Sequence, residues 1–120
     1  MNGTAKHDLS ERTKAFAVRV VRLYCALPRA PEAQILGKQM LRSGTSAGAH
    51  YREAFRARSP AEFISKIEAG LQELEETIYW FELLVEVGIV KEGRLVDLRK
   101  EAEELTAILV ASVKTAKKRA

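Results

Sequence analysis

Hydrophobic residues recur at helical spacing in four stretches of the chain, and no stretch shows the alternation typical of strands. The first stretch follows a capping pattern, Asp8 with Glu11, and ends before Pro28. Its apolar positions share one face: Leu9, Phe16, Val20, Leu23 and Leu27. We therefore predict a first helix over residues 9–27.

The second stretch begins at Pro31, where a missing N–H costs a helix nothing. Its apolar face comprises Leu36, Met40, Ser43, Ala47, Tyr51 and Ala54. A loop over residues 43–49 would split it, but the apolar register continues through that run of small residues, which favours one helix. Gly37, Gly44 and Gly48 lie beside the apolar face, so we expect another helix to approach closely there, in the same subunit or in the next one.

The third stretch opens with Ser59-Pro60-Ala61-Glu62, which combines an N-cap, a proline at the first helical position and a reciprocal Glu. Gaps of three and four then separate Ile64, Ile67, Leu71, Leu74, Ile78, Phe81 and Val85, as in the seam of a helical bundle. Gly88 is suited to end this helix. A short link leads to the fourth stretch, whose seam is Leu95, Leu98, Ala102, Leu105 and Leu109.

These elements predict an all-α fold, an antiparallel up-down four-helix bundle, because short links place successive helices side by side in opposite directions. A chain of 120 residues has room for one such domain. We assign residues 1–8 to a disordered tail, 9–114 to the bundle and 115–120 to a basic tail.

The composition favours a cytoplasmic protein. The apolar runs are too short to span a bilayer, and the N-terminus lacks the apolar segment of a signal peptide. A single cysteine, Cys25, cannot form an internal disulfide, and we expect it to be buried as free cysteines usually are.

Charge is divided unevenly along the chain. Residues 1–58 hold eleven Lys/Arg and four Asp/Glu, whereas residues 59–113 hold five and twelve. The last seven residues add four cations, for a net charge of +4. This division indicates either a polyanionic partner for the basic half or pairing between the halves.

The basic residues of the second helix form a stripe opposite its core face, at 100° per residue. The candidate nucleic-acid-binding residues are Lys38, Arg42, Arg52 and Arg56 in this stripe, Arg58 beyond it, and Arg12, Arg19 and Arg22 on the first helix. Guanidinium groups bind phosphate in bidentate fashion, and neutralised phosphates supply much of the affinity for nucleic acid. The alternative is a solubilising face, or ion pairs with the acidic helices.

Sites for catalysis, metals and cofactors are not indicated. The two histidines, His7 and His50, have no Glu three residues before them, as a carboxylate-bridged metal bundle would require. Tyr79 and Trp80 point away from the seam and indicate a partner surface, or else a core wide enough to cover them. We expect no cofactor and no enzymatic activity.

Several motifs resemble the bacterial four-helix-bundle family, the 23S rRNA intervening-sequence proteins. They are the run from Ser43 to Ala54, Arg56-Ala57-Arg58-Ser59, Ala61-Glu62-Phe63-Ile64, and Leu74-Glu75-Glu76-Thr77 with Tyr79-Trp80. The resemblance implies a ring, typically a homopentamer. It also implies kinship with the accessory protein of diversity-generating retroelements, which binds nucleic acid and a reverse transcriptase. His50 departs from the family pattern, which usually has Asn there.

Two hypotheses follow. The first is a non-enzymatic oligomeric accessory protein that binds nucleic acid, RNA in preference to DNA, through the phosphate backbone. The second is a ring-shaped protein–protein scaffold that binds no nucleic acid, with Tyr79 and Trp80 in contact with a protein partner. Under either hypothesis, the candidate oligomer or close-packing residues are Gly37, Gly44, Gly48, Tyr79 and Trp80. Because head-to-tail contact in a ring would also use opposite charges, the two hypotheses compete for the same basic residues.

Overall fold

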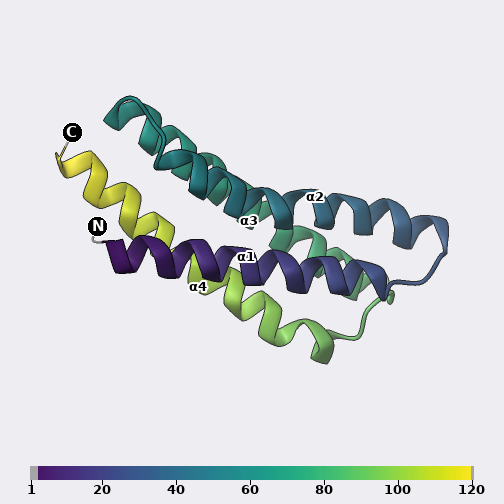
Figure 1. Cartoon of the computed structure of the whole chain (residues 1–120). Helices are drawn as coiled ribbons and strands as arrows, with labels where there is room; N and C mark the ends of the chain where they lie inside the picture. The colour runs from purple at the N-terminus through teal and green to yellow at the C-terminus, as the bar shows by residue number, and fades with distance from the viewer. Residues whose placement is uncertain (1–2, 120) are drawn as a thin grey trace.

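A computed structural model describes residues 3–119 of the chain, with side chains from residue 8 onward. Within this range the chain forms four helices and no strand, which confirms the all-α class. The helices are α1 (Gly3–Cys25), α2 (Pro31–Ala54), α3 (Pro60–Glu86) and α4 (Glu92–Arg119) (Figure 1). Met1, Asn2 and Ala120, which belong to the two expected tails, lie outside the described residues.

The first and last helices extend further than the sequence pattern indicated. Residues 3–8 belong to α1 and residues 115–119 to α4, where we expected tails. Neither segment contains a proline, so nothing in them interrupts the helical hydrogen bonds, and a capping pattern such as Asp8 with Glu11 does not require a helix to begin there. At its other end α1 stops at Cys25, two residues before the predicted boundary.

The second helix is continuous through its small residues, as predicted, and its glycines contact α1 of the same chain. A Cβ placed on Gly44 would lie 2.8 Å from a methyl group of Val20, and one on Gly48 would lie 3.0 Å from the hydroxyl of Thr13. Gly37 faces Leu27 in the same way. The close-packing role is therefore fulfilled within the subunit, and these glycines are not available to a neighbouring subunit.

The third helix begins and ends as its sequence predicts. The Ser59 side chain accepts a hydrogen bond from the Glu62 backbone N–H at 3.1 Å, and the Glu62 carboxylate accepts one from the backbone N–H of Arg58 at 3.3 Å. At the other end Gly88 has a φ of +79°, a conformation that favours glycine. The backbone N–H of Ile89 then bonds to the carbonyl of Leu84 at 3.0 Å, which closes the last turn.

The buried face of α3 is rotated relative to the predicted seam. Its buried residues are Ile67, Gly70, Leu74, Thr77, Phe81 and Leu84. Four predicted seam residues are only half-buried, namely Ile64, Leu71, Ile78 and Val85. The rotation arises because α3 packs most extensively against α2, whose small residues draw Gly70 and Thr77 into the interface.

The four helices form an elongated domain of 47 × 21 × 19 Å around one core. Each helix contacts the next one along the chain, and a small contact between α4 and α1 completes the circuit. The start of α1, the turn between α2 and α3 and the end of α4 lie at the same end of the molecule (Figure 1).

Cys25 is exposed, contrary to our expectation. Leu23, two residues before Cys25, lies on the buried face of α1. Residues two apart are separated by about 200° around a helix, so Cys25 lies on the side opposite Leu23. Helical register therefore outweighs the general tendency of free cysteine to be buried.

Candidate nucleic-acid interface

Four of the candidate cations present a free, exposed face to solvent. Lys38, Arg52, Arg56 and Arg58 are all exposed, and none forms an ion pair with the side chains of residues 8–119. Lys38 and Arg52 lie on the exposed side of α2, away from its buried face, and Arg56 and Arg58 lie in the turn that follows the helix. Between them only the small side chains of Thr45 and Ala49 separate the α2 backbone from solvent.

Arg42, in contrast, is held by acidic residues of α3. Its Nη1 atom lies 3.2 Å from Glu73 Oε2, and its Nη2 donates to Glu76 Oε1. The hydrogen bond to Arg42 lowers the pKa of Glu76, and the same bond raises the pKa of Arg42. Trp80 Nε1 also donates to Glu76, at 3.3 Å. This guanidinium is therefore neutralised within the subunit.

The candidate residues of α1 divide in the same way. Arg12 donates from Nε to Glu101 Oε2 at 3.1 Å and from Nη2 to the other oxygen, a bidentate pair that joins α1 to α4. The hydrogen bond raises the pKa of Arg12. Arg19 and Arg22 are exposed and form no ion pair with the described side chains. Arg12 thus supports the fold, whereas Arg19 and Arg22 are free.

Tyr79 and Trp80 differ in their surroundings. Tyr79 is 54% exposed, whereas Trp80 is half-buried against the core and hydrogen-bonded to Glu76. Their rings meet edge to face with centroids 5.0 Å apart. The core therefore covers most of Trp80, and Tyr79 is the residue of the pair that remains on the surface.

His50 lies at the border between α2 and α3, beside charged residues of both helices. Its Nδ1 atom is 3.3 Å from Glu53 Oε1, and Glu53 also pairs with Lys66 of α3 at 3.3 Å. No hydrogen bond to Nδ1 is formed by the described residues. The arrangement fits a side chain that packs in the helix interface.

A groove that sequence reasoning missed lies at the end of the molecule where α2 and α4 finish. We call it the end groove. It has a volume of about 610 Å³ and is lined on one side by Phe55, Pro60 and Phe63 and on the other by Ile108, Ala111 and Arg119, among others. No local motif reveals it, because its two walls are separated by more than forty residues and meet only in the tertiary fold.

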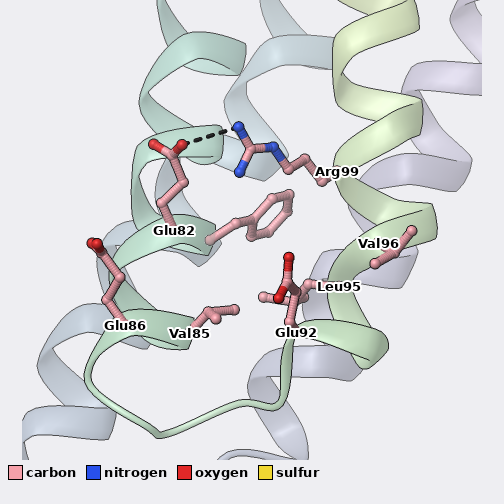
Figure 2. Close-up of a pocket in the computed structure, with 8 residues that line it drawn as sticks. Glu82, Val85, Glu86, Glu92, Leu95, Val96 and Arg99 are labelled. Carbon is pink, nitrogen blue, oxygen red and sulfur yellow. Dashed lines mark ion pairs between the residues drawn. The ribbon is translucent and has the colours of Figure 1, made fainter.

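A second cleft of about 440 Å³ lies between α3 and α4, towards the opposite end of the molecule. Figure 2 shows Glu82 of α3 and Arg99 of α4 meeting across it; the two form an ion pair of 3.0 Å. Phe81, Val85, Leu95 and Val96 give it apolar walls. The carboxylates around it include Glu86 and Glu92, so this cleft is acidic and unsuited to phosphate.

The described residues contain no group of three or more His, Cys, Asp or Glu side chains placed to hold a metal ion. In the same part of the chain, no helix has the length and hydropathy needed to cross a membrane.

An all-α domain of four helices with a free basic face defines the class of this protein. The family model described as 23S rRNA-intervening sequence protein matches residues 5–111, and the chain belongs to that family. The chain is similar to a solved protein of unknown function from the S23 ribosomal protein family of Bacteroides thetaiotaomicron VPI-5482. The two share 36% identity over 91% of this chain and 97% of the other, with a TM-score of 0.85. No curated protein matches the sequence.

Proposed function

We propose that this protein is a non-enzymatic, oligomeric accessory protein that binds the phosphate backbone of nucleic acid. The observation that carries the proposal is a set of exposed cations on α2 and the turn after it that form no ion pair with the described side chains: Lys38, Arg52, Arg56 and Arg58. A guanidinium without a carboxylate partner can neutralise a phosphate and release its counterions at no cost in existing ion pairs. A guanidinium that is already paired must first break its ion pair with the carboxylate.

The candidate residues therefore contribute unequally. Arg19 and Arg22 extend the free basic surface onto α1, while Arg42 and Arg12 contribute less because Glu73, Glu76 and Glu101 already neutralise them. RNA is favoured over DNA because the family to which the chain belongs is described by reference to a 23S rRNA-intervening sequence.

The proposal includes self-association of an antiparallel up-down bundle into a closed ring, with the homopentamer of the resembled family as the expected form. Support comes from apolar side chains left partly exposed on α3 and α4. Ile78 and Val85 of α3 are half-buried, Val85 lines the cleft between α3 and α4, and Val96 and Val110 of α4 are 52% and 37% exposed. A ring uses two different faces of each subunit, and this apolar face lies away from the basic face of α2.

A scaffold for protein partners, including a reverse transcriptase, is the second candidate. The 54% exposure of Tyr79 is the observation that favours it, because exposed aromatic side chains are enriched in interfaces. In that case capture of the partner would require Tyr79 and would be indifferent to Arg52 and Arg56.

The deciding experiment is fluorescence anisotropy with a structured RNA and with a DNA duplex, titrated across salt concentrations. For the Arg52→Ala/Arg56→Ala variant we expect the log–log slope of affinity against salt to flatten by about one to two units, because each lost phosphate contact removes about one released counterion. Arg94→Ala/Lys100→Ala is the matched control: it removes the same charge from exposed positions of α4 and should leave the slope nearly unchanged.

The absence of binding to either nucleic acid at low ionic strength would contradict the proposal and leave the scaffold function. Equal effects of the two double variants would show that binding follows net charge and has no site on α2.

A further inference from the structure

We propose that the end groove receives unstacked bases of a single-stranded nucleic acid, while the basic residues at its rims hold the adjoining phosphates. The inference rests on the proposed nucleic-acid binding and goes further, because it names the form of the ligand and a second surface that recognises it.

The floor of the groove offers aromatic surface. Phe55 and Phe63 meet edge to face with ring centroids 5.5 Å apart, and both residues line the groove; Phe55 also meets Tyr51 edge to face at 5.0 Å. Ile108 and Ala111 of α4 supply the facing apolar wall. Aromatic rings stack on bases irrespective of sequence, since every base has a π-face.

The rims carry charge complementary to phosphate. Arg56 and Arg58 lie in the turn that separates Phe55 from Phe63, and Arg119 lines the groove from the opposite side with Lys118 next to it in α4. All four are exposed and form no ion pair with the described side chains. Two nearby carboxylates are paired with lysines, Glu53 with Lys66 at 3.3 Å and Glu68 with Lys117 at 3.4 Å, and Glu62 accepts a hydrogen bond from the Arg58 backbone.

A single strand fits this combination better than a duplex, in which the bases are stacked on one another and their faces are inaccessible. An acidic amphipathic helix is the other ligand with matching charge. The two aromatic rings and the guanidinium of Arg119 in the lining favour bases, because bases stack on both kinds of surface.

The test compares two strands of equal length by fluorescence anisotropy: a single-stranded RNA and a strand with the same phosphates but abasic sugars. The wild-type chain should bind the RNA between about fivefold and about a hundredfold more tightly for each base that is stacked. The comparison isolates the bases because the electrostatic contribution is common to both strands.

Two variants test whether the preference for RNA over the abasic strand arises in the groove. Ala111→Trp fills the groove from an exposed position without disturbing the core and should reduce the ratio of the two affinities to about one. Phe63→Leu removes an aromatic face while keeping apolar bulk. Ala107→Trp, at an exposed position of the same helix that does not line the groove, and Phe16→Leu, in the core, are the matched controls and should retain the wild-type ratio.

Salt-dependent binding of both strands with equal affinity would overturn the inference while leaving the proposed function intact. A base preference that survives in Ala111→Trp would likewise overturn it. If the strands bind equally and an acidic amphipathic peptide binds in a way that Ala111→Trp blocks, the groove is a protein-docking site. Failure to bind any nucleic acid at low salt would instead contradict the proposed function itself.

Discussion

At the scale of single residues, the close approach of α2 to α1 depends on the absence of a side chain at Gly44. A Cβ there would lie 2.8 and 2.9 Å from the two methyl groups of Val20 and 3.2 Å from its Cβ. Since both methyl groups face the glycine and valine is stiff about χ1, rotation of Val20 does not clear the space. Any side chain at this position therefore forces the two helix backbones apart.

We expect Gly44→Ala to destabilise the protein by about 1–3 kcal/mol, because overpacking outweighs the gain of about 1 kcal/mol in helix propensity. Urea denaturation followed by circular dichroism measures the change. Gly93→Ala is the control: it lies in α4 with nothing within 4 Å of the added Cβ and should be neutral or slightly stabilising. A Gly44→Ala variant as stable as wild type would mean that α1 and α2 are not in this close contact.

The Arg42–Glu76 pair predicts a dependence of stability on pH. Because Arg42 lowers the folded-state pKa of Glu76, the pair stabilises the fold above the pKa of an unfolded Glu, and this contribution is lost as the pH falls through the lowered value. The pair is partly exposed, so we expect at most about 1 kcal/mol.

Unfolding free energies measured from pH 7 to pH 3 should show Glu76→Gln below wild type at neutral pH and equal to it at acid pH. Glu75→Gln, an exposed neighbour without an ion pair to the described side chains, should follow wild type throughout. A constant gap between Glu76→Gln and wild type would contradict the assignment.

At the scale of helices, the α2–α3 interface combines small residues with a buried polar contact. The hydroxyl groups of Ser43 and Thr77 lie 2.7 Å apart, and both residues are fully buried. Each hydroxyl also lies within hydrogen-bond distance of a carbonyl of its own helix, Met40 for Ser43 and Glu73 for Thr77. The contact fixes the register of the two helices, because a shift along the axis would leave both hydroxyl groups without this partner.

We expect Ser43→Ala and Thr77→Val each to reduce the unfolding free energy by about 1–2 kcal/mol, since each leaves a buried hydroxyl or carbonyl with one bond fewer. The double variant should cost less than the sum of the two, because the pair acts as a unit. Thr45→Val tests a hydroxyl bonded only within α2 and should have a smaller effect. Strict additivity in a double-mutant cycle would show that the two hydroxyl groups do not interact.

At the scale of the whole molecule, some of the cations pair with the acidic half of the chain and others do not. Part of the charge is used internally, in the pairs Arg12–Glu101, Arg42–Glu73, Arg42–Glu76 and Lys117–Glu68. The remaining free cations of α2 and its following turn lie away from the partly exposed apolar side chains of the α3–α4 face. The proposed nucleic-acid binding and the proposed self-association would therefore use different faces.

If the chain forms the proposed ring, the Val96→Lys/Val110→Lys variant should have a lower molecular mass in solution than wild type, because it introduces charge into the apolar α3–α4 face without entering the core. Light scattering coupled to size exclusion measures this mass. Val18→Lys/Val21→Lys, at positions of α1 that are each 39% exposed, is the control and should keep the wild-type mass. The reverse outcome would place the subunit contact on α1.

The sequence by itself determined the number and order of the helices, the continuity of α2 and the caps of α3. These follow from local chemistry: apolar spacing, proline and glycine at helix ends, and the Ser59 hydroxyl. It also identified the candidate cations of α1, of α2 and of the turn after α2, because side-chain type and angular position on a helix need no knowledge of neighbouring helices.

Only the tertiary structure decided which of those cations are free. Arg42 and Lys38 lie on the same stripe of α2, yet α3 places two carboxylates beside Arg42, and none of the described side chains pairs with Lys38. The sequence likewise did not predict which face of α3 is buried. It did not predict the end groove either, because the walls of the groove come from distant parts of the chain. Helical periodicity gives the direction of a side chain from its own axis, whereas pairing, burial and cavities depend on how the axes are set against one another.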